Sequence, residues 1–454
     1  MNLYHVLRFA QKPGRGLSGN SRKNFHIISE KIILVGLLLM FSFLAFGQDE
    51  AYIIRNTVTG CVNVRSTHDI NAGVVGCLDA GTPVTVIGTV PFWREIRFGN
   101  NKRGWIAKKF IEPTTAVPVS TDLTIPDTAY LTIHFIDVGQ GDAIWIQTFD
   151  DKIDGNGKFE GRSIVIDGGP YSTNTNNPVL SYIESEGHHG ADIEALIVTH
   201  PHVDHFKGSI AIAKHFNIKK YYDPGYPNTK ATYQSLLDII KGKNGVPPKA
   251  ERIHIGQANF GELNWGNELK VEVLYAWNGN PNNNLGDENT VENNSSIVLR
   301  IQYGDHVFLF MGDAEGKERN DSPATPKYVE KILLDNDTTR PKLKANLLKI
   351  AHHGSETSST TPFIQAVNPD IVIVQSGRKD FNGRYLPDRS TLLRYCTNNP
   401  NVKIYRTDQG DTVHHSEPAA VDKDNIIIRS NGRGQITVKA LQNGNIFTGN
   451  FCGN

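Results

Sequence analysis

The sequence predicts an α/β protein with a smaller all-β module ahead of it. From Thr128 onward, short β-branched apolar runs alternate with segments of helical period, a pattern typical of sheets covered by helices. Residues 51–113 instead carry short strand patterns separated by turns. The length of 454 residues also favours two or more domains.

Residues 1–47 are expected to be a secretory signal. An apolar stretch, Ile32 to Phe46, follows a basic segment and is shorter than the roughly 20 residues of a bilayer-spanning helix. Small residues at Ala45 and Gly47 predict cleavage before Gln48. The protein is then secreted or periplasmic, with no integral membrane domain after cleavage. The long basic segment leaves an uncleaved membrane anchor as the alternative.

The charge of the chain gives no global attraction for nucleic acid. The whole sequence has a formal charge of zero, and without residues 1–47 it holds 41 basic and 46 acidic residues, a net charge of −5. Nucleic-acid-binding proteins usually carry a basic excess. A local basic groove remains compatible with this total.

Four cysteines occur, an even and sparse set that favours disulfides in an exported chain. Cys61 and Cys77 share the small module, where a bridge would contribute about 3 kcal/mol. Cys396 and Cys452 are left as the second pair by elimination. Four free thiols are the alternative.

Residues 51–113 carry the patterns of short strands with turns between them. Val62–Ser66 alternates, Gly81 begins a turn before a β-branched run, and Trp93 and Gly104–Ile106 add further strand patterns. The stretch resembles a bacterial SH3-type domain, which implies a cell-wall or peptide-targeting module. A barrel that only spaces its neighbour is the other interpretation. The Thr-, Pro- and Ser-rich residues 114–127 are predicted to be a linker.

The main domain is expected at 128–420, followed by a C-terminal β-hairpin at 421–454 with its turn at Asn431–Gly434. The predicted strands are 131–136, 143–148, 163–166, 195–198, 269–275, 296–303, 306–311, 347–351, 371–375 and 402–405. The predicted helices are 179–186, 207–216, 232–241 and 327–334.

The most informative stretch, Thr199–His205, follows the apolar strand 195–198. It places His200, His202, Asp204 and His205 on a strand-to-helix loop. Imidazole and carboxylate groups are ligands for zinc and similar cations, and a loop in this position lets them converge. Two other histidine pairs, His188-His189 and His414-His415, lie in polar loops and are expected at the surface.

Three more predicted strands end in acids or imidazoles. Asp167 ends the strand 163–166, Asp313 follows 306–311, and His352-His353 follow 347–351. In α/β sheets, the carboxyl ends of the strands form the edge where sites assemble. The sequence therefore predicts one metal-binding edge.

These segments resemble the metallo-β-lactamase fold, and within it the hydrolase domain of ComEC-type DNA-uptake proteins. The matching stretches are Phe135–Ala143, Ile166–Gly169, Thr199–Gly208, Asn293–Leu299, Gly312–Glu315 and Leu348–Ser355. The resemblance implies a four-layer αββα sandwich with a two-metal site at one edge. The membrane-spanning portions of the uptake proteins are absent from this sequence.

The resemblance also implies the ligands. His200 and His202 bind one divalent ion, Asp204, His205 and His353 bind the other, and Asp313 bridges them. Asp167 supports the loop from behind. Whether His352 or His353 is the ligand stays open; His353 is favoured, with His352 facing substrate or packing. The ions are expected to be Zn²⁺, with Mn²⁺ as the alternative.

The sequence departs from the broader family at two positions. Asn293 or Asn294 stands where an additional histidine is usual, so the first ion should be held more loosely or through water. Leu386 stands where many relatives have a histidine, which removes a substrate contact or proton-transfer group.

Two such ions lower the pKa of a shared water, and the resulting hydroxide attacks a phosphoester. Asp204 would orient the nucleophile. Ser355, Arg378 and Lys379 follow strands at the same edge and are candidates for holding an anionic substrate. An exposed loop with no such role is the alternative.

Three functions remain open from the sequence. The first is an exported phosphodiesterase or nuclease acting on DNA. The second is a phosphoesterase for a cell-envelope polymer, brought to peptidoglycan by the SH3-type domain. The third is a metal-stabilised binding protein without catalysis, with Asn293 marking a degraded site.

Overall fold

The computed structural model describes residues 50–55, 61–80, 82–98, 102–113, 125–153, 155, 157–173, 177–189, 191–243, 248–255, 262–279, 285–377, 379–409, 424–442, 445–447 and 451–453. The expected signal segment 1–47, Arg378 and His414-His415 lie outside these residues. Within them, no helix is both long and apolar enough to cross a membrane.

The N-terminal module is a small β-barrel-like sheet. Its strands are β1 (Glu50–Ile54), β2 (Val62–Arg65), β3 (Val74–Leu78), β4 (Pro83–Val90), β5 (Trp93–Phe98), β6 (Lys102–Ala107) and β7 (Ile111–Pro113). They pair in the order β3-β2-β6-β5-β4-β1-β7. Alternate residues, among them Val62, Val64, Ile96 and Ile106, form its own apolar core. A disulfide joins Cys61 to Cys77, as predicted.

The first sheet of the main domain has nine strands. They are β8 (Leu131–Phe135), β9 (Ile144–Gln147), β10 (Ser163–Ile166), β11 (Asp192–Ile197), β12 (Asn217–Asp223), β13 (Glu251–His254), β21 (Ile426–Ser430), β22 (Thr437–Gln442) and β23 (Asn445–Phe447). Their order is β13-β12-β11-β10-β9-β8-β21-β22-β23. The predicted C-terminal hairpin therefore continues this sheet, because β21 pairs with β8.

The second sheet has seven strands. They are β14 (Glu262–Leu263), β15 (Leu269–Tyr275), β16 (Val298–Tyr303), β17 (His306–Phe310), β18 (Leu347–Lys349), β19 (Ile371–Val374) and β20 (Lys403–Arg406). They pair in that same order.

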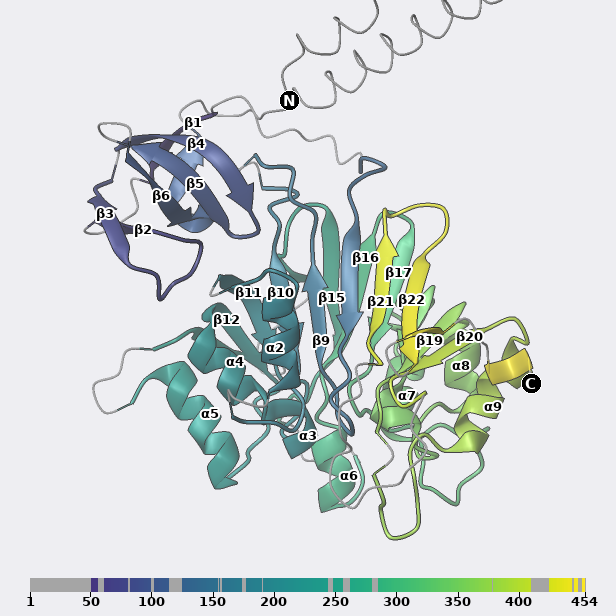
Figure 1. Ribbon diagram of the computed structural model, residues 1–454. Helices are drawn as coiled ribbons and strands as arrows, with labels where there is room; N and C mark the ends of the chain where they lie inside the picture. The colour runs from purple at the N-terminus through teal and green to yellow at the C-terminus, as the bar shows by residue number, and fades with distance from the viewer. Residues whose placement is uncertain are drawn as a thin grey trace, which may run out of the picture. The chain divides into compact units, whose positions relative to one another are not determined.

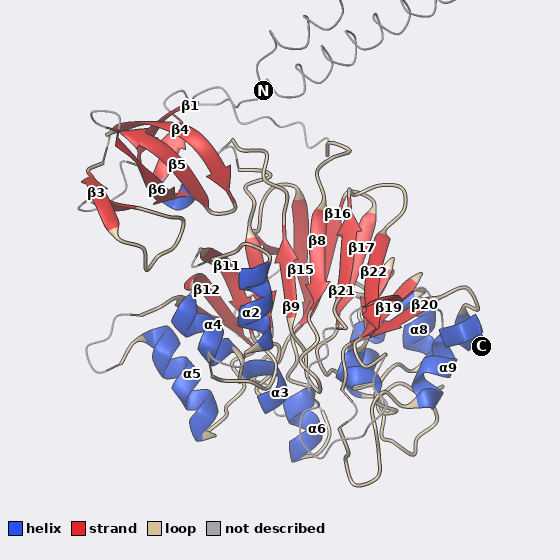
Figure 2. Cartoon of the chain, in the orientation of Figure 1, coloured by secondary structure: helices blue, strands red, loops and turns tan. Residues whose placement is uncertain are grey.

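The two sheets pack face to face, and helices cover their outer faces (Figures 1 and 2). The α-helices are α2 (Pro178–Ser185), α3 (Val203–Phe206), α4 (Ser209–His215), α5 (Ala231–Lys241), α6 (Glu288–Asn293), α7 (Tyr328–Asp335), α8 (Thr361–Val367) and α9 (Arg389–Asn398). Four short 3-10 helices are η3 (Lys108–Phe110), η6 (Arg340–Lys342), η7 (Ala351–Gly354) and η8 (Phe451–Gly453).

The strands show why four layers form. Successive side chains of a strand point to opposite faces. In β10, Ile164 and Ile166 enter the core between the sheets, whereas Val165 packs under α2, α4 and α5. In β18, Leu347 enters the central core and Leu348 packs under α7, α8 and α9. Both faces of these strands are buried, which gives the αββα sandwich expected.

The parallel strands bring the chemistry-bearing loops to one edge. β10, β11 and β12 are parallel to one another, and so are β17, β18, β19 and β20. Their carboxyl ends therefore lie along the same edge of each sheet. The loops after β10, β11, β17 and β18 meet there.

Several elements were not predicted. Strand β12 contains two lysines and directly follows the α4 pattern, whereas edge strand β13 has little apolar alternation. Helices α8 and α9 are short or weakly amphipathic.

A disulfide joins Cys396 of α9 to Cys452 of η8, as expected by elimination.

The surface position predicted for His188 is wrong. Its side chain is fully buried, with ring contacts to Trp145 and Phe216. Tertiary packing overrides the polar local sequence, because the His188 loop lies against the helix-covered face of the first sheet.

Candidate metal centre

Asp167 holds the histidine-rich loop that follows β11. Its carboxylate accepts hydrogen bonds from Thr199, at 2.8 Å from the backbone N–H and 2.7 Å from Oγ1. Nδ1 of His205 also donates to it, at 2.8 Å. This bond leaves Nε2 of His205 free to act as an electron-pair donor. Asp167 thus makes the supporting contacts that the sequence led us to expect.

Two glycines allow the loops after β10 and β11 to cross. A Cβ atom on Gly208 would lie 1.7 Å from the carbonyl oxygen of Gly168, and one on Gly168 would lie 2.4 Å from the backbone nitrogen of Ser209. Neither position can carry a side chain unless the backbone moves. The crossing fixes helix α3, which carries Asp204 and His205, beside Asp167.

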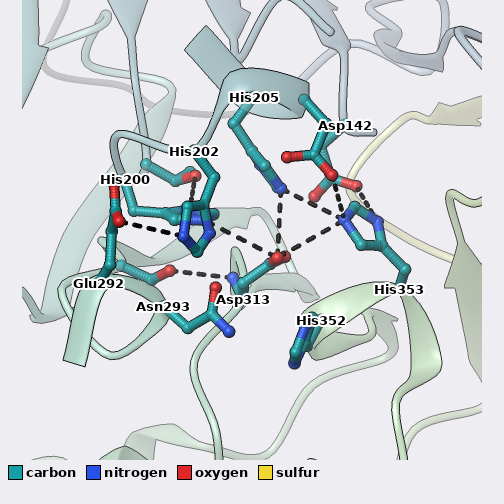
Figure 3. A network of polar contacts seen from close by, with 12 residues as sticks. Asp142, His200, His202, His205, Glu292, Asn293, Asp313, His352 and His353 are labelled. Carbon is teal, nitrogen blue, oxygen red and sulfur yellow. Dashed lines mark hydrogen bonds and ion pairs between the residues drawn. The ribbon is translucent and has the colours of Figure 1, made fainter. Parts of the chain in front are cut away.

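Two groups of side chains at this edge could each hold a metal ion (Figure 3). The first consists of His200, His202 and Asp313, and the second of Asp142, His205, Asp313 and His353. All of these side chains are buried except His202, which is partly exposed.

Asp313, from the loop after β17, belongs to both groups. Its Oδ2 atom lies 3.7 Å from Nε2 of His200, 3.3 Å from Nε2 of His205 and 3.5 Å from Nε2 of His353. A carboxylate at the junction of two imidazole groups has the position of a bridge between two ions.

The paired histidines after β18 have different partners. His353 is buried, and its Nδ1 atom donates to the carbonyl oxygen of Gln375 at 2.8 Å, which leaves Nε2 facing Asp313. His352 turns toward Glu315, with its Nδ1 atom 3.0 Å from the carboxylate. Both residues have positive φ, 47° and 50°, so consecutive side chains diverge at this turn.

Asp204 and Asn293 lie at the margins of the two groups. Asp204 Oδ2 is 3.6 Å from Nε2 of His353. The amide nitrogen of Asn293 donates to Glu315 at 2.9 Å, which leaves its oxygen for another partner. Both side chains line the same pocket.

The residues fit divalent cations. Oδ1 of Asn293 and Oδ1 of Asp313 are buried, and neither has a hydrogen-bond partner among the described residues. Buried acceptors without partners are costly, and a cation would satisfy both. Imidazole nitrogens and carboxylate oxygens are suitable ligands for zinc or manganese.

Charges within the cluster compensate one another. Burial lowers the pKa of His200 well below its usual value. Burial would also lower the pKa of His353, but Asp313 and Asp142 raise it to about 10. For Asp313, burial favours the neutral acid, whereas the adjacent His205 and His353 hold its pKa well below the usual value. Cation binding would therefore release protons from imidazoles.

A pocket of about 360 Å³ opens at the cluster. Besides the candidate ligands, it is lined by cationic and apolar side chains: Arg319, Lys379, Phe381, Arg384 and Leu386. The Lys379 ammonium lies 5.2 Å from the centre of the Phe381 ring. The edge therefore offers positive charge beside the buried acids.

Ser355 lines this pocket, but its hydroxyl group is already engaged. Its Oγ atom accepts a hydrogen bond from Arg319 at 3.3 Å and lies 2.9 Å from Oγ1 of Thr357. Arg319 is also held by Asp388 at 3.0 Å. In this arrangement Ser355 fixes an arginine at the pocket wall.

Sequence reasoning gave no role to Asp142, Glu292 and Glu315. Asp142 belongs to the motif 135–143, and its oxygens lie 3.2 Å from Nδ1 of His353 and 2.5 Å from Nζ of buried Lys349. Glu292 lies 3.3 Å from Nε2 of His202. Asp142 stands in the motif just before the predicted strand 143–148, which was a usable signal; the two glutamates carried none.

Comparisons with known proteins agree with this geometry. Residues 158–378 match the model of the metallo-beta-lactamase superfamily, and residues 60–112 match that of the bacterial SH3 domain. The chain is 23% identical to ComE operon protein 3 of Bacillus subtilis over 62% of its own length and 32% of the relative's. It is 27% identical to Recombination protein 2 of Haemophilus influenzae, over 48% of this chain and 21% of that one.

The chain thus carries a bacterial SH3 domain and, C-terminal to it in the sequence, a metallo-β-lactamase domain of the ComEC type. It spans about a third or less of the length of these curated relatives. Among solved structures, Zn(2+)-bound PqqB from Methylobacterium extorquens is 10% identical, with a TM-score of 0.32 over 53% of this chain and 88% of that one.

Proposed function

We propose that the protein is an exported two-metal hydrolase that cleaves phosphodiesters, as a nuclease does. One observation carries this proposal: a single oxygen, Oδ2 of Asp313, lies within 3.7 Å of ring nitrogens from His200, His205 and His353. Such convergence of buried acid and imidazole groups in a pocket is typical of catalytic metal sites.

The proposed ligands follow the two groups, except that Asp204 takes the place of Asp142 in the second. His200 and His202 would hold the first ion, with the Asn293 oxygen as a weaker ligand. Asp204, His205 and His353 would hold the second, and Asp313 would be shared by both sets. Zn²⁺ is the ion we expect, with Mn²⁺ as the alternative.

Bound divalent ions would supply a water nucleophile of lowered pKa and a Lewis acid for the substrate oxygen. The protein positions the reactants. Asp204 would orient the nucleophile, because its carboxylate lies at the pocket side of His353. His352, held by Glu315, lines the pocket and would hydrogen-bond the substrate.

An anionic substrate is supported by the cations of the pocket. Arg319, Lys379 and Arg384 line it together with the candidate ligands. Guanidinium and ammonium groups bind phosphate oxygens. The names of two relatives, Recombination protein 2 and Competence protein ComA of Neisseria gonorrhoeae, fit a nucleic acid as substrate.

Export is supported by the two disulfides, Cys61–Cys77 and Cys396–Cys452. Such bonds persist in oxidising compartments. We propose cleavage of residues 1–47, an SH3-type domain at 51–113, a linker at 114–127, the hydrolase domain at 128–420 and a hairpin at 421–454.

A second candidate keeps the chemistry and changes the substrate. The bacterial SH3 domain at 60–112 favours a cell-envelope target, such as a phosphate-bearing wall polymer. The net charge of −5 without residues 1–47 also disfavours bulk DNA slightly. Pull-down of the full chain on isolated peptidoglycan would support this candidate.

The test is hydrolysis by the purified full chain loaded with Zn²⁺ or Mn²⁺. The substrates are bis-p-nitrophenyl phosphate and single-stranded DNA, each with and without EDTA. We expect chelator-sensitive turnover that falls to background in Asp313→Asn. The control is Asp305→Asn, an exposed acid in the turn between β16 and β17.

Two results would contradict the proposal. Metal-loaded protein with no turnover on either substrate would remove the phosphodiester part. Fewer than one metal equivalent per chain, together with no activity, would favour a binding protein without catalysis.

A further inference from the structure

Gln140 lies in the loop between β8 and β9, and its backbone is fixed on both sides. A Cβ atom on the next residue, Gly141, would lie 2.3 Å from the carbonyl oxygen of Asp204. On the other side, a Cβ atom on Gly377 would lie 2.5 Å from the backbone nitrogen of Gln140. Gln140 is therefore held between the loop of candidate ligands and the segment after β19.

The side-chain amide of Gln140 has a defined orientation. Its Oε1 atom accepts a hydrogen bond from the backbone N–H of Gly377 at 3.4 Å. That contact assigns the oxygen and nitrogen of the carboxamide, whose two ends point in different directions. Nε2 therefore points away from Gly377.

Nε2 of Gln140 is a buried donor with no hydrogen-bond partner among the described residues. The side chain is only 1% exposed, yet it lines the same pocket as His353 and Asp313. A buried N–H group without an acceptor lowers the stability of the folded protein. A bound molecule that offers an acceptor atom in the pocket would remove this cost.

The chemical type of that partner follows from the other unpaired atoms. The unpaired oxygens of Asn293 and Asp313 are acceptors, which cations satisfy. Gln140 Nε2 is a donor, which a cation cannot satisfy. An electron-rich oxygen of a molecule bound in the pocket would satisfy it.

We propose that Gln140 is a catalytic residue that donates an Nε2–H hydrogen bond to a non-bridging oxygen of the substrate phosphoryl group. This inference rests on the proposed function, since it names a contact with the same substrate. A neutral amide suits the role, because it does not compete with cations for the carboxylates. Removal of one donor of this kind costs roughly 10²–10³-fold in turnover.

The experiment compares three variants of the full chain with wild type. Gln140→Met keeps the length of the side chain and removes the donor, and Gln140→Glu keeps its shape and replaces the donor with an acceptor. Gln365→Met, at an exposed position of α8, is the matched control. The measurements are kcat and KM on bis-p-nitrophenyl phosphate, bound metal, and calorimetric affinity for inorganic phosphate.

We expect both Gln140 variants to keep wild-type metal content and melting temperature. Their kcat/KM should fall about a hundredfold, and their affinity for inorganic phosphate should fall at least about tenfold. Gln365→Met should match wild type throughout. If Gln140→Met fails to fold, Gln140→Glu carries the test.

The calorimetric arm separates this inference from the proposed function. If wild type binds phosphate but has no turnover, the proposed function fails, and a Gln140-dependent affinity still supports the contact. Unchanged phosphate affinity in the Gln140 variants overturns the inference, as does a loss that parallels loss of metal. Absence of phosphate binding by the metal-loaded wild type overturns it as well.

Discussion

His134 makes the stability of the protein depend on pH in a way that can be measured. The residue lies on β8 and stacks on Trp145, with ring centroids 4.7 Å apart. Its Nε2 atom lies 3.0 Å from the Gln147 oxygen, and its Nδ1 atom lies 2.8 Å from the Tyr182 hydroxyl. A neutral imidazole satisfies both contacts, donating from one nitrogen and accepting at the other.

Burial lowers the pKa of His134 from 6.5 to about 4 in the folded protein. Below pH 6.5 the unfolded chain therefore binds a proton that the folded chain excludes. The stability that the neutral His134 contributes is fully present above pH 6.5 and is lost as the pH falls toward 4. From these two pKa values, the loss between pH 8 and pH 5 amounts to about 2 kcal/mol for this residue.

The perturbation is His134→Gln, which cannot titrate, and the measurement is the free energy of unfolding in urea at pH 8, 6 and 5. We expect the variant to be less stable at pH 8, because it loses ring packing on Trp145. Between pH 8 and pH 5 it should lose about 2 kcal/mol less than wild type. Equal losses in both proteins would refute the reasoning, since all other titrating groups are shared.

Two further predictions concern the loop support and the C-terminal disulfide. Asp167→Ala removes the acceptor for Thr199 and His205, so metal affinity should fall about 10- to 100-fold. Competition with a chromogenic chelator measures this, and an unchanged affinity would contradict the supporting role. The bond Cys396–Cys452 closes a loop with a sequence separation of 56, so the double Cys→Ser variant should lose about 4 kcal/mol of unfolding free energy. A melting temperature equal to that of wild type would contradict this expectation.

Local pattern was enough to predict most of the sandwich. The run Ile164-Val165-Ile166 is apolar on both faces, and such a strand needs a layer on each side. Strands β12, β13 and β14 were missed; the first two lie toward one edge of the first sheet and the third at an edge of the second, where lysines and glutamates are tolerated. Their pairing depends on neighbours far away in the chain, which no local period records.

The site could be predicted where its residues directly follow a predicted strand. His200, His202, His205 and Asp313 follow apolar runs, and the structure brings them together at one edge. The sequence favoured His353 over His352 as the ligand but did not decide between them. Their separation comes from two consecutive left-handed backbone conformations after β18, which turn one ring inward and the other toward Glu315.

The amino-acid order by itself indicated the α/β class, the small β-rich module and the imidazole-rich loop, and favoured the disulfide pairs that the structure contains. These features are set by short-range periodicity, by composition and by a small number of cysteines. Only the tertiary structure decided that Asp142 joins His205, Asp313 and His353 in one group, and that Gln140 lines the same pocket as His353. The reason is physical: an unpaired donor or acceptor is defined by the atoms around it, and those atoms come from strands that are far apart in the chain.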